Sequence, residues 1–338
     1  MEPFGTLDDE LVHRITIGNP DGMRAVILTY GAALAEMWVP DRAGRLADVV
    51  LGWDKLEDYV GQRGCFGATC GRYANRIADG RFLLDGVPYQ LDVNEGPTTL
   101  HGGPRGFHKQ VWQVLDRDTH HVTLGLLSPD GDQGFPGRLS TTVTYRISGG
   151  ALYIVLNAAS DVPTIINLVN HAYWNLGGHD ALDVLDHTLQ VNALHYLPVD
   201  DRKIPTGEIA PVADTAFDFR VARPVGFRVN ATPAGYYDHN WCLDIARGEI
   251  GPALVLSDPE SGRAMSVSTT EPGVQLYSAA HLDGSLRGKG GIAYPRAAGL
   301  AIETQNWPDA PNQAGFPTFD LRPDETYDHT IRYAFSAH

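Results

Sequence analysis

The sequence has 338 residues but only three cysteines, Cys65, Cys70 and Cys242. Three cysteines in a chain of this length do not form a disulfide framework, and an odd number leaves at least one thiol unpaired. Cys65 and Cys70 have no second cysteine pair that would complete a structural zinc site. We therefore expect small buried or free thiols in a reducing compartment, and no bound metal.

The sequence also lacks a long apolar run and an excess of basic residues. Its longest uncharged apolar stretch, around residues 25–35, is shorter than the roughly 20 residues that a membrane-spanning helix needs. Residues 1–5 show neither the basic nor the apolar region of a signal peptide. Lys and Arg number 26 against 41 Asp and Glu, a net charge of −15 that disfavours nucleic acid and anionic membranes as partners. We expect a cytoplasmic protein that binds neither.

Sustained helical periodicity is scarce, and the best candidate, residues 54–60, covers two turns at most. Instead, 37 glycines and 22 prolines separate short segments in which polar and apolar residues alternate. Such alternation is typical of strands. Residues 141–147 and 152–156 form one pair, and Gly149-Gly150 between them suits a hairpin turn because glycine tolerates positive φ.

More segments show the strand pattern, and no β-helix-β alternation accompanies them. They cover residues 122–127, 188–192, 253–257, 264–268, 274–278 and 300–303. Short strands with frequent turns predict an all-β protein, a large antiparallel β-sandwich or barrel. Length alone allows about two domains, but no repeat, low-complexity segment or composition shift marks a boundary.

Two segments resemble ligand-binding loops without completing them. The glycines at 61, 64, 67 and 71 are followed neither by a helical pattern nor by the Lys-Ser/Thr of a phosphate-binding loop. Residues 130–134 resemble the start of a calcium loop, but Thr141 stands where its twelfth-position glutamate belongs. Both segments are interpreted as turns.

Two of the 13 histidines stand in unusual contexts. His101 lies in Thr-Thr-Leu-His-Gly-Gly, and His171 lies among asparagines that interrupt an apolar segment. Each is either a hydrogen-bonded structural residue or a ligand-binding one, since small neighbours permit close approach of a ligand. Neither has the short His-x-His or His-x₃-His spacing of a metal site.

Glu303 ends the apolar segment Gly-Leu-Ala-Ile and is followed by Thr-Gln-Asn-Trp-Pro-Asp. It is either a surface glutamate that begins a loop or a partly desolvated carboxylate with a pKa raised toward that of a useful base. Carboxylates, amides and an aromatic face together suit a sugar, whose hydroxyls need donors and acceptors while its C–H face stacks on a ring. Residues 236–241, Tyr-Tyr-Asp-His-Asn-Trp, have a similar composition.

Eight segments resemble, in the same order, those of the aldose 1-epimerase (galactose mutarotase) family. They are residues 71–82, 100–103, 106–112, 128–137, 167–176, 237–240, 272–277 and 303–309. The resemblance covers most of the chain. It implies the large antiparallel sandwich of that family and the interconversion, without a cofactor, of the α and β anomers of a free aldose such as galactose or glucose.

The resemblance also implies roles for individual residues. Glu303 would be the general base, His171 the general acid, and His101 would lie near the ring oxygen of the sugar. The expected sugar-binding residues are Asn75, Arg76, Asp238 and Gln275. The sequence departs from the family at aromatic positions, where we expect an effect on sugar preference rather than on the reaction: Trp174, Tyr277 and Trp307.

Ring opening needs a deprotonated base and a protonated acid at neutral pH, and a glutamate with a histidine meets that need. The site residues span more than two-thirds of the chain yet must meet at one sugar, which predicts a single domain, residues 1–338, as a monomer or homodimer. Two alternatives remain on the same fold. One is a hexose-6-phosphate 1-epimerase, for which Arg72 and Arg105 lie near the site segments. The other is a non-catalytic sugar-binding protein.

Overall fold

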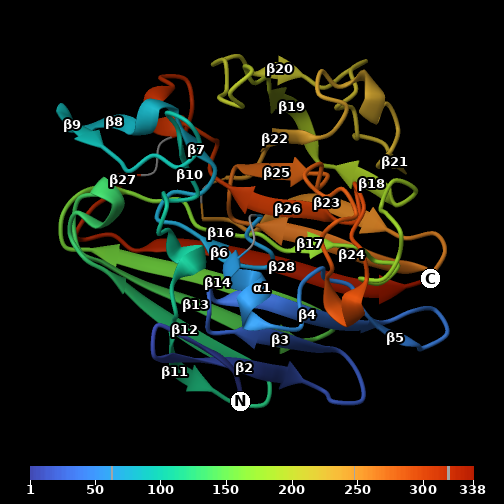
Figure 1. Ribbon diagram of the computed structural model, residues 1–338. Coiled ribbons are helices and arrows are strands. Elements are labelled where there is room, and N and C mark those ends of the chain that lie inside the picture. The colour runs from blue at the N-terminus through green and yellow to red at the C-terminus, as the bar shows by residue number, and fades with distance from the viewer. Residues whose placement is uncertain (62–63, 247, 318–319) are drawn as a thin grey trace.

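The computed structural model describes residues 1–61, 64–246, 248–317 and 320–338, and large antiparallel sheets dominate it (Figure 1). The largest sheet has nine strands. In spatial order they are β11 (Gln113–Arg117), β12 (His121–Ser128), β13 (Leu139–Ser148), β14 (Ala151–Ser160), β28 (Tyr327–Ala337), β24 (Arg263–Thr269), β23 (Gly251–Ser257), β18 (Thr188–Val191) and β21 (Arg223–Pro224).

The predicted hairpin lies in this sheet, between β13 and β14. Ser148 pairs with Ala151, and Gly149 and Gly150 between them have φ of 57° and 74°. Both angles lie in the region that glycine adopts without strain. The prediction of two strands joined by a Gly-Gly turn is therefore confirmed.

A six-stranded sheet and a five-stranded sheet complete the main architecture. The first has the order β17 (Tyr173–Trp174), β26 (Leu300–Gln305), β25 (Gly273–Tyr277), β22 (Asp238–Leu243), β19 (Ala193–Leu197) and β20 (Ala210–Pro211). The second has the order β1 (Glu2–Leu7), β2 (Glu10–Gly18), β3 (Arg24–Leu28), β4 (Ala33–Pro40) and β5 (Leu46–Asp48).

Short elements connect the sheets. Two-stranded pairs join β6 (Thr69–Cys70) to β16 (Val169–Asn170), β7 (Arg76–Ile77) to β10 (Thr99–Leu100), β8 (Arg81–Leu84) to β9 (Val87–Gln90), and β15 (Thr164–Ile165) to β27 (Asp320–Leu321). The predicted short helix is α1 (Leu56–Gly61). Single 3₁₀ turns cover Ala78–Gly80, Phe107–Lys109, Asp132–Gly134, Val229–Ala231, Lys289–Gly291 and Ala310–Asn312.

One hydrophobic core joins the three large sheets. It includes Ile15 of β2, Val143 of β13, Trp241 of β22 and Ile302 of β26, each at most 1% exposed. Burying one such side chain contributes about 1.5–3 kcal/mol. The core therefore anchors one face of the six-stranded sheet, and alternate residues of the same strands point to the other face. The all-β sandwich expected from the sequence is confirmed.

The second loop-like segment is a turn, and the described part of the first contains turns between α1, which ends at Gly61, and β6; residues 62–63 lie outside the described residues. Gly64 and Gly67 have positive φ. In the second segment, Asp130 Oδ1 accepts a hydrogen bond from the Gly137 backbone N–H at 2.6 Å, and Asp132 accepts one from the Ser128 hydroxyl. The acidic side chains are thus used within the loop itself.

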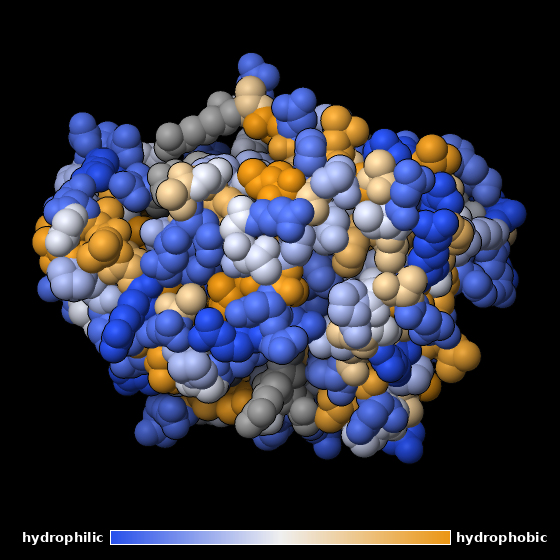
Figure 2. Space-filling model, turned by 90° about the horizontal axis from the view of Figure 1, so that it is seen from above, coloured by the Kyte–Doolittle hydropathy of each residue, from blue (hydrophilic) through white to orange (hydrophobic). Residues whose placement is uncertain are grey.

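Polar side chains predominate on the face seen from above in Figure 2, where hydrophobic residues form small separate groups. Within the described parts of the chain, no helix is long and apolar enough to cross a membrane.

Candidate functional site

A cavity of about 400 Å³ brings together residues from both halves of the chain. This volume falls in the range of small-ligand sites, about 300–1,000 Å³. Six of the seven site residues expected from the sequence line it: Asn75, Arg76, His101, His171, Asp238 and Glu303. The seventh, Gln275, donates a hydrogen bond of 2.7 Å from Nε2 to Asp238 Oδ1.

The pairing of strands β22, β25 and β26 positions the two acidic residues of this cavity, Asp238 and Glu303. Glu303 of β26 pairs with Gln275 of β25, and Asp238 of β22 pairs with Tyr277, two residues further along β25. Directly paired residues, and residues two apart on one strand, share a face of the sheet. These four side chains therefore lie on one face, whereas Ile302, next to Glu303, faces the core.

The histidines of the cavity are positioned by turns rather than by long strands. The His101 backbone N–H donates to the Asn75 carbonyl oxygen at 3.0 Å, and the Asn75 backbone N–H donates to His101 Nδ1 at 3.2 Å. Because Nδ1 accepts, the neutral ring carries its proton on Nε2. Burial lowers the pKa of His101 to about 3. At pH 7 this ring is thus a neutral hydrogen-bond donor.

Gly102 makes this turn possible. Its φ is +82°, and a Cβ atom at this position would lie 1.8 Å from the carbonyl oxygen of Gly71. No side chain fits at that distance, so only glycine allows the two backbones to approach this closely. The Leu-His-Gly-Gly segment therefore contributes backbone geometry as well as the His101 ring.

His171 follows β16, and hydrogen bonds of its backbone N–H and carbonyl groups fix its position. Its N–H donates to the Ala68 carbonyl oxygen at 2.9 Å, and its carbonyl accepts from the Gly67 N–H at 3.0 Å. Its Nε2 atom lies 3.4 Å from Oε1 of Glu303. The His101 and His171 rings are 5.2 Å apart and nearly perpendicular. The carboxylate and both imidazoles thus converge on one point of the cavity.

Glu303 is only 2% exposed. Burial raises its pKa to about 7, with the nearby His171 opposing the rise and Asp238 adding to it. A carboxyl with this pKa is about half ionised at neutral pH, the condition that suits a general base. The alternative interpretation from the sequence, a surface glutamate that begins a loop, is therefore wrong.

Among the expected site residues, three buried polar atoms have no hydrogen-bond partner in the described part of the chain: Glu303 Oε2, His171 Nδ1 and Gln275 Oε1. Leaving such an atom unpaired costs about 1–3 kcal/mol. Their clustering around one cavity fits a ligand that carries several hydroxyl groups.

Other lining residues were not predicted from the sequence. Arg76 makes two hydrogen bonds to the carboxylate of Glu95, one of 2.9 Å, and both line the cavity. The Lys203 ammonium lies 4.7 Å from the centroid of the Tyr236 ring. The remaining unpredicted members are Gly64, Cys65, Leu100, Tyr173 and His281. Tyr173 pairs with Ala301, two residues before Glu303. Strand register alone would therefore have placed the Tyr173 side chain on the same sheet face as Glu303.

The three aromatic residues at which the sequence departs from the family lie in different parts of the structure. Tyr277 lines the cavity. Trp174 is fully buried in the core, 4.8 Å from Tyr333 between ring centroids, and Trp307 donates from Nε1 to the Pro272 carbonyl oxygen at 3.0 Å. Neither tryptophan is among the described lining residues. The aromatic faces available to a sugar are therefore those of tyrosines, not of indoles.

Two groups of potential metal ligands occur in this region. The donor atoms of Cys65, Cys70 and His101 lie within 4.8 Å of one another, as do those of His101, His171 and Glu303. His101 belongs to both groups, and its Nδ1 is already occupied by the Asn75 N–H. The expectation that no metal is bound stays a prediction.

Comparison with known proteins identifies the family. Residues 13–334 match the family model described as aldose 1-epimerase. Human galactose mutarotase is 45% identical over 318 residues, which cover 94% of this chain and 92% of the relative. The chain belongs to the aldose 1-epimerase family. Its activity is accordingly that of an isomerase acting at the anomeric carbon of an aldose.

Further members agree in sequence and fold. The aldose 1-epimerase of Escherichia coli K12 is 36% identical over 337 residues, covering 98% of this chain and 97% of the relative. The crystal structure of the aldose epimerase homologue from C. elegans superposes with a TM-score of 0.90 at 34% identity, covering 96% of this chain and 99% of that one. The galactose 1-epimerase of Lactobacillus acidophilus gives 0.85 at 31% identity, with coverages of 99% and 97%.

Proposed function

We propose that Glu303 is the general base and His171 the general acid in the interconversion of the anomers of a free aldose, with galactose or glucose as substrate. One observation carries the proposal. A buried carboxyl with a pKa of about 7 lies 3.4 Å from an imidazole, in a cavity of the size of a small-ligand site. Such a pair can remove one proton and deliver another within the same cavity.

The proton steps balance without a cofactor. Glu303 takes the proton of the C1 hydroxyl, the bond between C1 and the ring oxygen breaks, and that oxygen takes a proton from His171 Nε2. The resulting aldehyde rotates about the C1–C2 bond. On reclosure the C5 hydroxyl attacks C1, His171 takes that hydroxyl's proton back, and Glu303 returns its proton to the C1 oxygen. Each positioned proton transfer contributes about 10²–10⁴-fold in rate.

His101 has a different role in this proposal. Its ring is neutral at pH 7, because burial lowers its pKa to about 3. It therefore donates a hydrogen bond from Nε2 to the ring oxygen and orients it, while His171 supplies the transferred proton. In this proposal His171 is the acid and His101 is a hydrogen-bond donor. The sequence alone leaves open which of the two histidines is the acid.

The remaining residues hold the sugar. Arg76 and Asp238 form charge-assisted hydrogen bonds to hydroxyls, Asn75 adds its amide, and Gln275 orients Asp238 through their 2.7 Å hydrogen bond. We further propose that residues 1–338 act as one domain, because these positions belong to one cavity. The protein would act in the cytoplasm as a monomer or homodimer, with neither nucleic acid nor membrane as a partner.

Neither arginine considered for the phosphate alternative lines the cavity. Arg72 is only 2% exposed, and its guanidinium donates to the Ser128 hydroxyl and to the carbonyls of Pro129 and Pro136. Arg105 is exposed. These contacts favour a neutral aldose over a hexose 6-phosphate. Retention of the Glu303–His171 pair favours an enzyme over a non-catalytic sugar-binding protein.

Polarimetry on freshly dissolved α-D-galactose tests the assignment. Glu303→Gln should lower kcat by about 10²–10⁴-fold, and the exposed Glu249→Gln should leave it unchanged. Wild-type turnover in Glu303→Gln would exclude Glu303 as the base. Faster turnover of glucose 6-phosphate than of glucose would favour the phosphate alternative, and sugar binding without accelerated mutarotation would favour a binding protein.

A further inference from the structure

Two cysteines meet at the wall of the sugar cavity. The sulfur atoms of Cys65 and Cys70 and a ring nitrogen of His101 lie within 4.8 Å of one another. Cys242, the third cysteine, is buried in a separate cluster that includes Leu197 and Phe316. The chain therefore contains one close dithiol and one isolated thiol.

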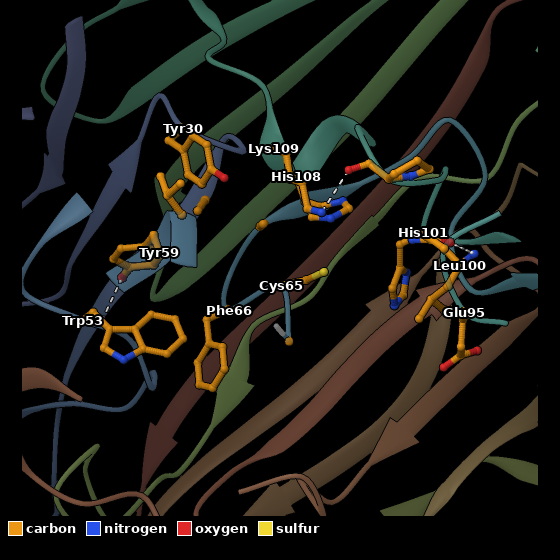
Figure 3. Close-up of a pocket in the computed structure, with 16 residues that line it drawn as sticks. Tyr30, Trp53, Tyr59, Cys65, Phe66, Glu95, Leu100, His101, His108 and Lys109 are labelled. Carbon is orange, nitrogen blue, oxygen red and sulfur yellow. Dashed lines mark hydrogen bonds between the residues drawn. The ribbon is translucent and has the colours of Figure 1, made fainter. Parts of the chain in front are cut away.

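The two thiols differ in access. Cys65 lies in a turn closed by a 2.9 Å hydrogen bond from the Ala68 N–H to its carbonyl oxygen, whereas Cys70 is fully buried in β6. Cys65 lines both the sugar cavity and an adjoining cavity of about 340 Å³, shown in Figure 3, where its side chain lies below His108 and to the left of His101. A small polar reagent in either cavity thus reaches Cys65 first, with Cys70 behind it.

Electrostatics favour the same order. A hydrogen bond from the Cys70 thiol, helped by His108, lowers the pKa of Cys65 well below its usual range, while burial raises that of Cys70. An accessible thiolate beside a resolving thiol is the arrangement typical of oxidant-sensitive cysteines.

We propose that Cys65 and Cys70 form a peroxide-sensitive dithiol that closes to a disulfide and thereby lowers turnover. The Cys65 thiolate attacks one oxygen of hydrogen peroxide and becomes a sulfenic acid as the O–O bond breaks, releasing water after proton uptake. The Cys70 sulfur then attacks the Cys65 sulfur and displaces a second water. Overall, two thiols and one peroxide give one disulfide and two waters.

The link to activity follows from position and rests on the proposed function. Disulfide formation draws the two sulfurs to about 2.05 Å, so the turn that holds Cys65 must move. Gly64 and Cys65 of this turn line the sugar cavity next to His101. A displacement of about 1 Å near reacting groups can cost about 10²-fold in rate.

Peptide mass analysis of the folded protein after hydrogen peroxide and alkylation tests the chemistry. In the wild type and in Cys242→Ser, the fragment with both cysteines should lose about 2 Da relative to the dithiol, and in the wild type Cys242 should stay alkylated. In Cys70→Ser, Cys65 should instead gain about 16 or 32 Da. Preferential oxidation of Cys242, or absence of the disulfide in the wild type, would overturn the proposal.

Polarimetry on the same samples tests the effect on turnover. Peroxide should lower wild-type and Cys242→Ser activity about tenfold or more, and dithiothreitol should restore it. Cys70→Ala provides a second variant should Cys70→Ser fold poorly. A disulfide with unchanged activity would refute the regulatory part. Absence of activity in untreated wild type would instead contradict the proposed function, and the mass analysis would still decide the dithiol.

Discussion

The sugar cavity is built from two groups of residues that are held in different ways. The strand-borne group is Asp238, Gln275 and Glu303, on adjacent strands of the six-stranded sheet. The turn-borne group is Asn75, His101 and His171, each in a connection next to a two-residue strand. Both groups reach one cavity by different physical means.

The two groups depend on different interactions for their positions. Glu303 lies in β26, which is hydrogen-bonded to β25 on one side and to β17 on the other. Its position is therefore set by sheet register and by the core beneath Ile302. Asn75 and His101 have φ of 58° and 51°, a region that non-glycine residues occupy only when their surroundings hold them there. The turn-borne group should therefore be the more sensitive to backbone changes.

The largest expected effect tests whether the two groups act as one catalytic unit. His171→Asn and Glu303→Gln should each lower kcat by about 10²–10⁴-fold, since each removes one of the two proton transfers. The double variant should be little slower than the slower single variant, because residues that act as a unit are strongly non-additive. Polarimetry on α-D-galactose measures all three. Multiplicative losses would mean that the groups act independently.

A substitution that disturbs the turn-borne group without the strand-borne group must act on the backbone of a turn. Gly102→Ala should destabilise the protein by about 3 kcal/mol or more, because its Cβ would overlap the Gly71 carbonyl. Gly131→Ala is the matched control. Its φ is +76° with nothing within 4 Å of the added Cβ, so it should cost only about 1–2 kcal/mol. Urea unfolding measures both, and equal costs would argue against close backbone approach at Gly102.

The two groups also differ in what the sequence reveals. Alternation predicted six strands of the nine-stranded sheet, namely β12, β13, β14, β18, β23 and β24, and the segments containing Gln275 and Glu303. It did not predict β28, the longest strand of that sheet. It missed β3 (Arg24–Leu28), in which four of the five residues are buried, because a strand covered on both faces shows no alternation. Two-residue strands such as β7 and β10 are too short for any period.

Local sequence context singled out His101, His171 and Glu303, but their roles and the sugar-binding residues came from family resemblance. Convergence of Asn75, His101 and His171 depends on contacts between distant segments, which no local pattern contains. Lys203 has a φ of 64° in an irregular connection and gives no periodic signal. Cys65 was interpreted only as a thiol, since its position beside His101 appears once the chain is folded.

A binding defect confined to the strand-borne group is the next smaller effect. Asp238→Asn keeps an oxygen that can accept from Gln275 Nε2 but loses the negative charge that grips a sugar hydroxyl. We expect KM to rise about tenfold, equivalent to about 1.4 kcal/mol, with a smaller loss in kcat. Initial rates over a range of galactose concentrations separate the two parameters. A fall in kcat alone would place Asp238 in the chemical step.

The smallest effect concerns stability and again involves the strand-borne group. Burial raises the pKa of Glu303 from 4.5 to about 7, so the folded state opposes ionisation that the unfolded state permits. Above pH 7 this costs up to about 3 kcal/mol, and the cost fades as pH falls from about 7 to 4.5. Glu303→Gln should therefore raise Tm at pH 8 by a few degrees and leave it nearly unchanged at pH 4.5. An equal change at both pH values would contradict this.

In the proposed mechanism, the strand-borne, desolvated carboxylate of Glu303 is the base of the reaction. The pH dependence of wild-type kcat/KM on α-D-galactose, with the buffer-catalysed rate subtracted, tests it most directly. Glu303 must be ionised in the free enzyme, so kcat/KM should fall below a midpoint near pH 7, where burial has moved its pKa. An acid limb with a midpoint near pH 4.5, typical of an exposed glutamate, would contradict the account.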